Sequence, residues 1–503
     1  MKSKKIDNLV IKCVAALLFP MVLCAVFCWI RGTSLFEMYA PDSYNNDSFF
    51  YYKMVQGVLD NGIPKGYFGY NESRAAIGSF GVWSPLILIP WVVWGVLFGW
   101  GYTSAFACNI VFFSIAMLTF VVLSRIDGKG MICMFCMLSV VPSLPLHLLS
   151  CLPEANLLSI VLIYISLGIG FQYTSHKRLF IVVMSVLCIM LTIIRPFMVI
   201  LAVIPCYYLF KGKIKGAIFY TFGIIIGGVG LYFLGSRFLS APYFNELFDF
   251  SLLENILHGN INAAIGYVLG CIRKVVPQLL SYIEQAFSYG LTAGTQYVTA
   301  IATAVLLCYH VFLDKKANNK IVYIMLILMD VALICAVILL HGKVNEGGRH
   351  IFVFAIIGCI ICSLEKGAVS YISRILIGFI FAFMIYQGAL IPTDYDIPIQ
   401  KEATRVSIEY WENAFEENGV TLSENVGWEN TLIWSFSNYN ELYATPEGMG
   451  VSCCFPAYII ENFSALKSRY IAVSSGSEID TMCMDAGFDE IGRTAQVVIY
   501  QRY

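Results

Sequence analysis

Charge is scarce in this sequence: Asp, Glu, Lys and Arg make up 13% of its 503 residues, whereas 58% are hydrophobic. Soluble domains carry about a quarter charged residues, so this balance excludes an ordinary soluble protein and predicts an integral membrane protein. The formal net charge of −1 provides no basic field of the kind that attracts nucleic acid. We therefore expect membrane lipids as partners and no nucleic acid.

Several functional patterns are also missing. The six histidines have no paired spacing, so no stable metal site is predicted. Most of the 17 cysteines fall inside apolar runs, where they act as small hydrophobic residues. Cys453, Cys454 and Cys483 lie in a more polar region, and their spacing leaves a disulfide open. The chain has no internal repeat and no inverted pair of broken helices of the kind that many transporters show.

Long apolar runs are abundant. Runs long enough to cross a hydrocarbon core of about 30 Å occur near 10–30, 82–100, 104–124, 131–150, 155–174, 179–194, 197–210, 216–234, 293–313, 321–340, 350–364 and 372–392. The first run has a basic start and lacks a small-residue cleavage site. We therefore expect a retained first span rather than a signal peptide.

Basic residues test this number of spans, because short loops rich in Lys and Arg stay in the cytoplasm. These basic segments lie at 2–5, 125–129, 177–178, 211–215, 315–320 and 366–374. All of them fall on one side of the membrane only if one apolar run between residues 30 and 125 does not cross it. The run "SPLILIPWVVWGVLFGW" contains two prolines and three tryptophans, which suits a helix at the membrane interface. This predicts about 11 spans, with the N-terminus inside and the C-terminus outside.

The remaining segments then lie outside the membrane. Loop 235–292 is amphipathic and should follow the membrane surface. From residue 394 the composition becomes that of a soluble domain, with a helical pattern at 402–419 and strand patterns at 430–436, 470–475 and 496–501. The predicted fold is an all-α polytopic membrane domain, residues 1–393 with outer loops 31–103 and 235–292, followed by a small extracytoplasmic α/β domain, residues 394–503.

Two aspartates follow the first span in "YAPDSYNNDSFFYYKMVQGVLDNGIP", residues 39–64. Apolar residues after Asp47 recur at helical spacing and stop at Asn61 and Gly62, so Asp47 should begin a helix. As a helix cap its carboxylate would contribute about 1 kcal/mol. As a general base it would accept a proton from an incoming hydroxyl or amine. The two roles are compatible.

Other ionisable residues stand near the ends of predicted spans. Glu154 opens a span, where a carboxylate also favours the helix dipole. The outer turn "HGKVNEGGRH" is unusually basic, and the guanidinium fork of Arg349 suits either phosphate oxygens or lipid headgroups. Arg195 needs a partner, which could be an outer-loop carboxylate or a phosphate. Asp330 falls within a span and favours a proton-coupled transporter.

Taken together, these motifs resemble the start of the GT-C glycosyltransferases, which are polytopic enzymes that use lipid-phosphate-linked sugars. The resemblance rests on a first span followed by "NNDSFFYY", "GIPKGYFGYNES" and "GVWSPLILIPW". Protein O-mannosyltransferases and aminoarabinose transferases share this architecture. In the former an arginine precedes the second acid, where Leu149 and Ser150 stand here. The Trp-Trp-Asp signature of oligosaccharyltransferases is absent from the C-terminal domain.

This resemblance implies roles for individual residues. Asp47 would be the catalytic base, with Asp42 as the alternative, and Glu154 a second acid of the site. The donor phosphate would be bound by Arg349, His350, Lys343 and Arg195. Tyr51, Tyr67 and Tyr70 would contact the sugar or acceptor, or else anchor the loop at the interface. No cofactor is predicted, and a divalent cation stays open.

The expected activity is transfer of a sugar from a polyprenyl-phosphate-linked donor to a glycan, lipid or protein acceptor, with inversion. It would take place on the extracytoplasmic face of a bacterial plasma membrane, in the assembly or modification of cell-envelope glycans. One alternative is a transporter or flippase for a lipid-linked glycan, for which Asp330 is the best evidence. Another is an envelope polysaccharide polymerase.

Overall fold

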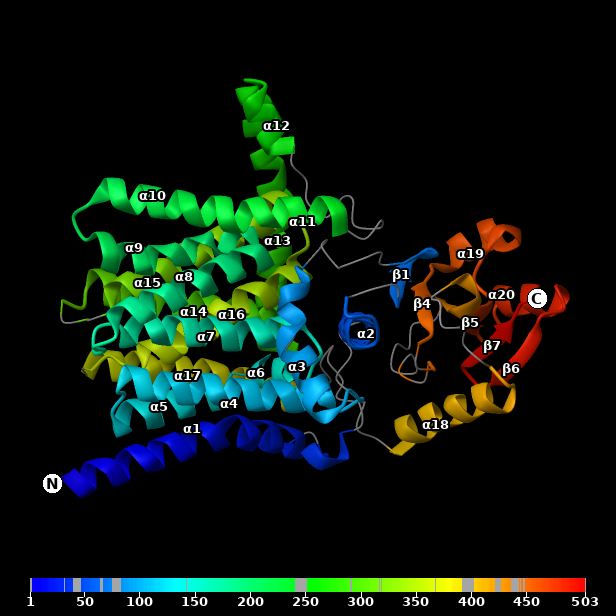
Figure 1. Ribbon diagram of the computed structural model, residues 1–503, viewed down its shortest axis with the longest axis horizontal. Helices are drawn as coiled ribbons and strands as arrows, with labels where there is room; N and C mark the ends of the chain where they lie inside the picture. Colours follow the sequence, from blue (N-terminus) through cyan, green and yellow to red (C-terminus); the bar gives the residue numbers. More distant parts are fainter. Residues whose placement is uncertain are drawn as a thin grey trace.

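The computed structural model describes residues 2–30, 32–38, 47–63, 67–74, 83–141, 143–239, 251–289, 292–315, 317, 319–366, 368–390, 402–420, 427–435, 443, 445–446 and 448–502. Most of them form a bundle of apolar helices, and a smaller domain built around a sheet lies at one end of the bundle (Figure 1). The predicted fold class, an all-α membrane domain with a small C-terminal α/β domain, is confirmed.

Within these residues, nine helices are long and apolar enough to cross a membrane, so the chain is an integral membrane protein. They are α1 (Lys2–Ile30), α4 (Ser104–Ser124), α7 (Pro153–Gly170), α8 (Lys177–Ile194), α10 (Ile214–Ile224) continued by η4 (Ile225–Gly230) and α11 (Leu231–Leu239), α13 (Ile261–Tyr289), α14 (Thr292–Phe312), α15 (Lys320–Ala336) continued by η6 (Val337–His341), and α16 (Val344–Cys362).

Shorter apolar segments complete the bundle. They are α5 (Gly128–Ser139) followed by α6 (Ser143–Leu148), η3 (Pro196–Ala202) followed by α9 (Val203–Phe210), and α17 (Ala368–Leu390), whose apolar part is Arg374–Met384. Figure 1 shows α5, α9 and α17 alongside the long helices.

α12 (Ser251–Leu257) and α13 run across the bundle rather than along it (Figure 1). The Tyr267 hydroxyl of α13 donates to the Leu339 carbonyl in the middle of η6, at 2.8 Å. Phe287, near the other end of α13, packs against Phe383 of α17. α13 thus lies across several helices of the bundle, as predicted for an amphipathic segment that follows the membrane surface. Without α13, the eight other long helices and three shorter segments of the described chain agree with about 11 spans.

α3 (Ile89–Phe98) also lies across the direction of the bundle helices, after the short turn η2 (Pro85–Leu88) (Figure 1). A helix of this length rises about 15 Å, half of the hydrocarbon core, so it does not cross. This agrees with the predicted interfacial helix. Of the tryptophans in this run, Trp91 is buried and donates to Asn109 Oδ1 at 2.8 Å.

The sheet of the smaller domain has the strand order β2-β1-β4-β3-β5-β7-β6. β1, β4, β3 and β5 run parallel, and β2, β7 and β6 pair antiparallel to their neighbours. The strands are β1 (Phe68–Tyr70), β2 (Ser73–Arg74), β3 (Thr431–Ser435), β4 (Gly450–Cys453), β5 (Tyr470–Ser474), β6 (Asp489–Arg493) and β7 (Val497–Gln501), and the helices are α18 (Glu402–Glu417), α19 (Pro456–Asn462) and α20 (Glu478–Asp485).

The predicted helix at 402–419 and the three predicted strands are therefore present, whereas β4 and β6 were not predicted. More importantly, β1 and β2 belong to the first outer loop, so this sheet combines the loop with the C-terminal part of the chain. The boundary between residues 393 and 394 stays a prediction, because residues 391–401 lie outside the described residues. Cys454 and Cys483 are not part of a disulfide.

Candidate functional site

α2 (Asp47–Asn61) lies between the bundle and the sheet domain (Figure 1). Asp47 is its first residue, as predicted, and Gly62 ends it with a φ of 75° that suits glycine. The Ser48 hydroxyl accepts a hydrogen bond from the backbone N–H of Cys151 at 3.4 Å. This contact ties the start of α2 to the turn that leads into α7.

A cluster of charged residues forms where α2, α7 and α16 meet. The Arg349 Nη1 donates to Asp47 Oδ2 at 2.7 Å, although the two residues are 302 positions apart. The Nε of Arg349 lies 3.2 Å from Glu154 Oε1, and the Nδ1 of His350 lies 2.9 Å from the same oxygen. Arg349 and Glu154 are buried, whereas the Asp47 side chain is 29% exposed. Asp47 therefore occupies the open side of the cluster.

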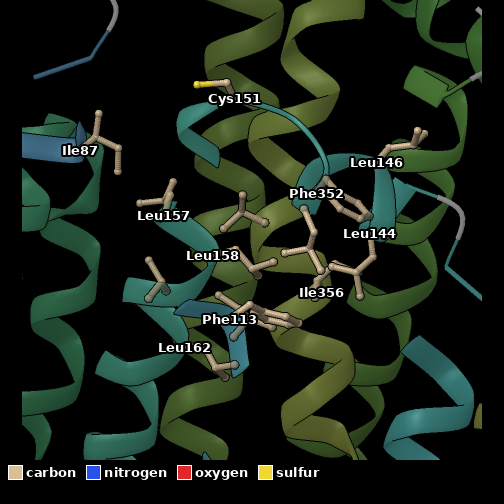
Figure 2. Packing of buried hydrophobic residues seen from close by; sticks show 14 of the residues in the cluster. Ile87, Phe113, Leu144, Leu146, Cys151, Leu157, Leu158, Leu162, Phe352 and Ile356 are labelled. Carbon is tan, nitrogen blue, oxygen red and sulfur yellow. The ribbon is translucent and has the colours of Figure 1, made fainter. Parts of the chain in front are cut away.

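Rigid packing beneath the cluster fixes its members. Glu154 lies in the first turn of α7, after Pro153, and the two basic residues lie near the start of α16. Figure 2 shows Leu158 of α7 packed with Phe352 and Ile356 of α16 and with Phe113 of α4. Leu158 and Phe352 are buried about one helical turn below the charges and Ile356 about two turns below them, so the separation of α7 and α16 is set by the core.

Arg195 and Trp83 extend the site. The guanidinium carbon of Arg195 lies 4.1 Å from the ring centroid of Trp83, and the Trp83 ring contacts that of His350 edge to face, at 5.5 Å. Arg195 is buried, and burial lowers its pKa from the ordinary value. No carboxylate of the described residues forms an ion pair with it. A buried cation of this kind is stabilised by an anion.

Of the predicted tyrosines, Tyr51 lies at the cluster. Burial and the negative charges of Asp47 and Glu154 raise the pKa of its hydroxyl well above the ordinary value. Tyr67 is buried next to β1, and Tyr70 lies within that strand. Their role in sugar or acceptor binding stays a prediction. The alternative that this loop's aromatic residues anchor it in lipid is wrong for Phe49, Phe50 and Tyr51, which are buried in protein.

Among the described residues, no contact joins Lys343 or Asp330 to this cluster. The Lys343 ammonium is exposed and pairs with Glu346 at 3.0 Å, so its proposed contact with a donor phosphate stays a prediction. Asp42 lies outside the described residues. Asp330 is buried on α15, and neither of its carboxylate oxygens has a hydrogen-bond partner among the described residues.

Sequence reasoning did not find His147 of α6. Its Nδ1 contacts the Ser143 carbonyl at 2.9 Å, and its ring packs against Phe352. A single histidine in an apolar run gives no signal of this position. Within the described part of the chain, no group of three or more His, Cys, Asp or Glu residues could hold a metal ion.

No family model matches the sequence, and neither does any curated protein. Among solved structures, the chain is similar to the oligosaccharyltransferase AglB from Archaeoglobus fulgidus in complex with an inhibitory peptide and a dolichol-phosphate, at 11% identity over 93% of this chain and 69% of that chain, with a TM-score of 0.48. It is also similar to ArnT from Cupriavidus metallidurans bound to undecaprenyl phosphate, at 10% identity over 97% of each chain, with a TM-score of 0.44.

Proposed function

We propose that this protein is a membrane glycosyltransferase that takes a sugar from a polyprenyl-phosphate-linked donor and transfers it to a glycan, lipid or protein acceptor. The supporting observation is the combination of charges at the bundle end. A partly exposed carboxylate, Asp47, contacts Arg349, and a second buried arginine, Arg195, has no ion-pair partner among the described residues. A base and a cation for the leaving phosphate are what such a transfer needs.

In the proposed reaction, the acceptor oxygen or nitrogen attacks the anomeric carbon while Asp47 accepts its proton. The bond between that carbon and the phosphate oxygen breaks, and polyprenyl phosphate leaves with the electron pair. Arg195 and Arg349 would stabilise the negative charge that develops on the departing phosphate. Attack from the face opposite the phosphate inverts the anomeric configuration. On the predicted topology, the reaction takes place on the extracytoplasmic face.

Glu154 and His350 would act mainly on Arg349. The carboxylate of Glu154 lies within 3.2 Å of the Arg349 Nε and within 2.9 Å of the His350 Nδ1, and it is fully buried. A fixed counter-charge keeps the guanidinium oriented, so that little reorganisation is needed when a phosphate arrives. The planar face of Trp83 would orient Arg195 in the same way.

The test is to incubate the purified protein with a panel of undecaprenyl-phosphate-linked and dolichyl-phosphate-linked sugars and to measure donor turnover. We expect Asp47→Asn to lower turnover by at least about 100-fold, the usual contribution of a positioned general base, with donor binding retained. Asp60→Asn is the matched control, because Asp60 is an exposed carboxylate at the other end of α2.

Two outcomes would contradict the proposal. Full activity of Asp47→Asn would remove this residue as the base. Donors that bind to the wild-type protein, move across the bilayer and stay intact would instead favour the flippase alternative, in which Asp330 is the residue of interest. A product that carries many sugars would assign the same chemistry to a polysaccharide polymerase.

A further inference from the structure

The hairpin between β1 and β2 contains a glutamate in an unusual backbone conformation. Tyr70 pairs with Ser73, so that Asn71 and Glu72 form a two-residue turn, and both have positive φ angles, 44° and 57°. Turns of this type usually place glycine at the second position, because other side chains are strained there. The strain at Glu72 suggests that its side chain has a role that glycine would not fill.

The Glu72 carboxylate is buried in the C-terminal part of the sheet domain. Its Oε1 accepts three hydrogen bonds, from the Lys467 N–H at 2.8 Å, the Ser468 N–H at 2.7 Å and the Ser468 hydroxyl at 2.7 Å. The backbone N–H of Glu72 donates to the Ser452 hydroxyl at 2.7 Å. One residue of the first outer loop therefore binds both β4 and the segment that precedes β5. Hydrogen bonds to an ionised carboxylate are stronger than neutral ones.

Strand β1 extends this attachment toward α2. The Val451 N–H donates to the Tyr67 carbonyl and the Asn71 N–H to the Cys453 carbonyl, both at 3.0 Å, so that β1 is held along β4. Phe68 of β1 then packs edge to face against Phe50, with ring centroids 5.1 Å apart.

Phe68 also contacts Phe49, which in turn packs against Tyr443 of the C-terminal part at 5.2 Å. Phe49 and Phe50 lie in the same first turn of α2 as Asp47. Buried aromatic contacts of this kind transmit position, since close-packed rings cannot move independently. A continuous set of contacts thus joins Glu72 to the start of α2.

We propose that Glu72 is a positioning residue, which locks the first outer loop to the C-terminal domain and so holds Asp47 against Arg349. The inference rests on the proposed function for its effect on turnover, and it extends that function by making the C-terminal domain part of the active site. It also predicts that the contact itself can be measured without a substrate.

The first arm of the test is amide hydrogen exchange of the full-length protein in nanodiscs, which needs no donor. We expect Glu72→Ala to speed exchange by at least about tenfold in peptides covering 67–74 and 450–453, and also in the first turns of α2. Glu72→Gln should speed exchange less than Glu72→Ala does, because an amide oxygen accepts the same three hydrogen bonds but without the charge that strengthens them. Glu461→Ala, at an exposed position of α19, is the matched control.

The second arm is steady-state turnover of whichever donor the wild type uses. We expect Glu72→Ala to lower kcat by about 10- to 100-fold, the range expected for a displacement of about 1 Å of a reacting group. The KM for the donor should stay within about twofold, and Glu72→Gln should recover most of the rate. Ser468→Ala, which removes one of the three donors, should give a smaller loss of the same kind.

The outcomes separate this proposal from the proposed function. Unchanged exchange in Glu72→Ala, or faster exchange in 67–74 with no change in α2, would overturn the positioning role. If no donor is turned over by the wild type, the proposed function fails, and the exchange arm still decides the structural role of Glu72. If Glu72→Ala does not fold, the comparison of Glu72→Gln and Ser468→Ala with Glu461→Ala decides it.

Discussion

On the proposed function, Arg195 binds the phosphate through a guanidinium whose central carbon lies 4.1 Å from the Trp83 ring centroid and which has no carboxylate partner among the described residues. Replacing Arg195 by glutamine removes both the positive charge and the planar guanidinium group. Since hydrogen bonds to charged groups contribute roughly 1.5–3 kcal/mol, we expect Arg195→Gln to weaken binding of undecaprenyl phosphate by about 10- to 100-fold. Isothermal titration in nanodiscs measures this affinity.

Arg195→Lys tests geometry separately from charge. Lysine keeps the positive charge but lacks the planar group that stacks on indole and binds two phosphate oxygens, so an intermediate affinity is expected. Arg178→Gln serves as the control, because Arg178 is exposed on α8. Wild-type affinity in Arg195→Gln would show that the phosphate binds elsewhere.

The ionisation of Asp47 sets the pH dependence of turnover. Burial raises the pKa of Asp47 above its ordinary value, and the contact with Arg349 offsets part of this effect. A general base works only when it is deprotonated, so kcat/KM should fall as the pH drops through this raised pKa. The acidic limb of the pH profile, where kcat/KM falls, should therefore have its midpoint above the ordinary aspartate pKa of about 3.9.

Removing Arg349 should move this acidic limb of the pH profile to still higher pH. Without the neighbouring positive charge, the deprotonated carboxylate is less stable, so the pKa rises and the limb of Arg349→Gln shifts to higher pH. The profile of kcat/KM against pH, measured also for Lys366→Gln, checks this. Lys366 is an exposed cation that pairs with Asp127, and its loss should leave the limb in place. Identical limbs in Arg349→Gln and the wild type would refute the assignment.

For some elements, residues at or near the two ends were sufficient to predict where the element begins and ends. The start of α2 at Asp47 and its end before Gly62 follow from helical spacing and a glycine stop. The prolines and glycines that flank α3 limit its length, and α18 carries its own amphipathic pattern. Each of these signals acts within a few residues, so the sequence alone contains it.

Other elements depend on partners far along the chain. β1 and β2 have three and two residues, too few for any periodicity, and β1 exists because it pairs with β4 from the C-terminal part. The Trp91 indole turns inward because Asn109 of α4 offers it an acceptor. The chemistry of Asp47 and Arg349 marks each as a candidate on its own, but only the fold, which brings the start of α2 beside Arg349 of α16, shows that they touch.

Short loops that contain lysine and arginine lie at one end of the whole molecule. In Figure 1 the loops that join α4 to α5, α7 to α8 and α9 to α10 lie at the end marked by the N-terminus, and the sheet domain lies at the opposite end. These loops and the first residues of the helices that follow them carry seven basic residues, Arg125, Lys129, Lys177, Arg178, Lys211, Lys213 and Lys215. Since such loops stay in the cytoplasm, the cluster around Asp47 should face the other side of the membrane.

Cysteine accessibility in whole cells tests this orientation. We expect a membrane-impermeant maleimide to label Asp60→Cys on α2 in intact cells, and to label Gly128→Cys and Lys213→Cys only after permeabilisation. All three positions are exposed, and a side chain added at Gly128 meets no atom within 4 Å, so failure to label reports sidedness rather than burial. The unsubstituted chain gives the background of the native thiols. Labelling of Gly128→Cys in intact cells, with Asp60→Cys labelled only after permeabilisation, would reverse this orientation, and the active site would then face the cytoplasm.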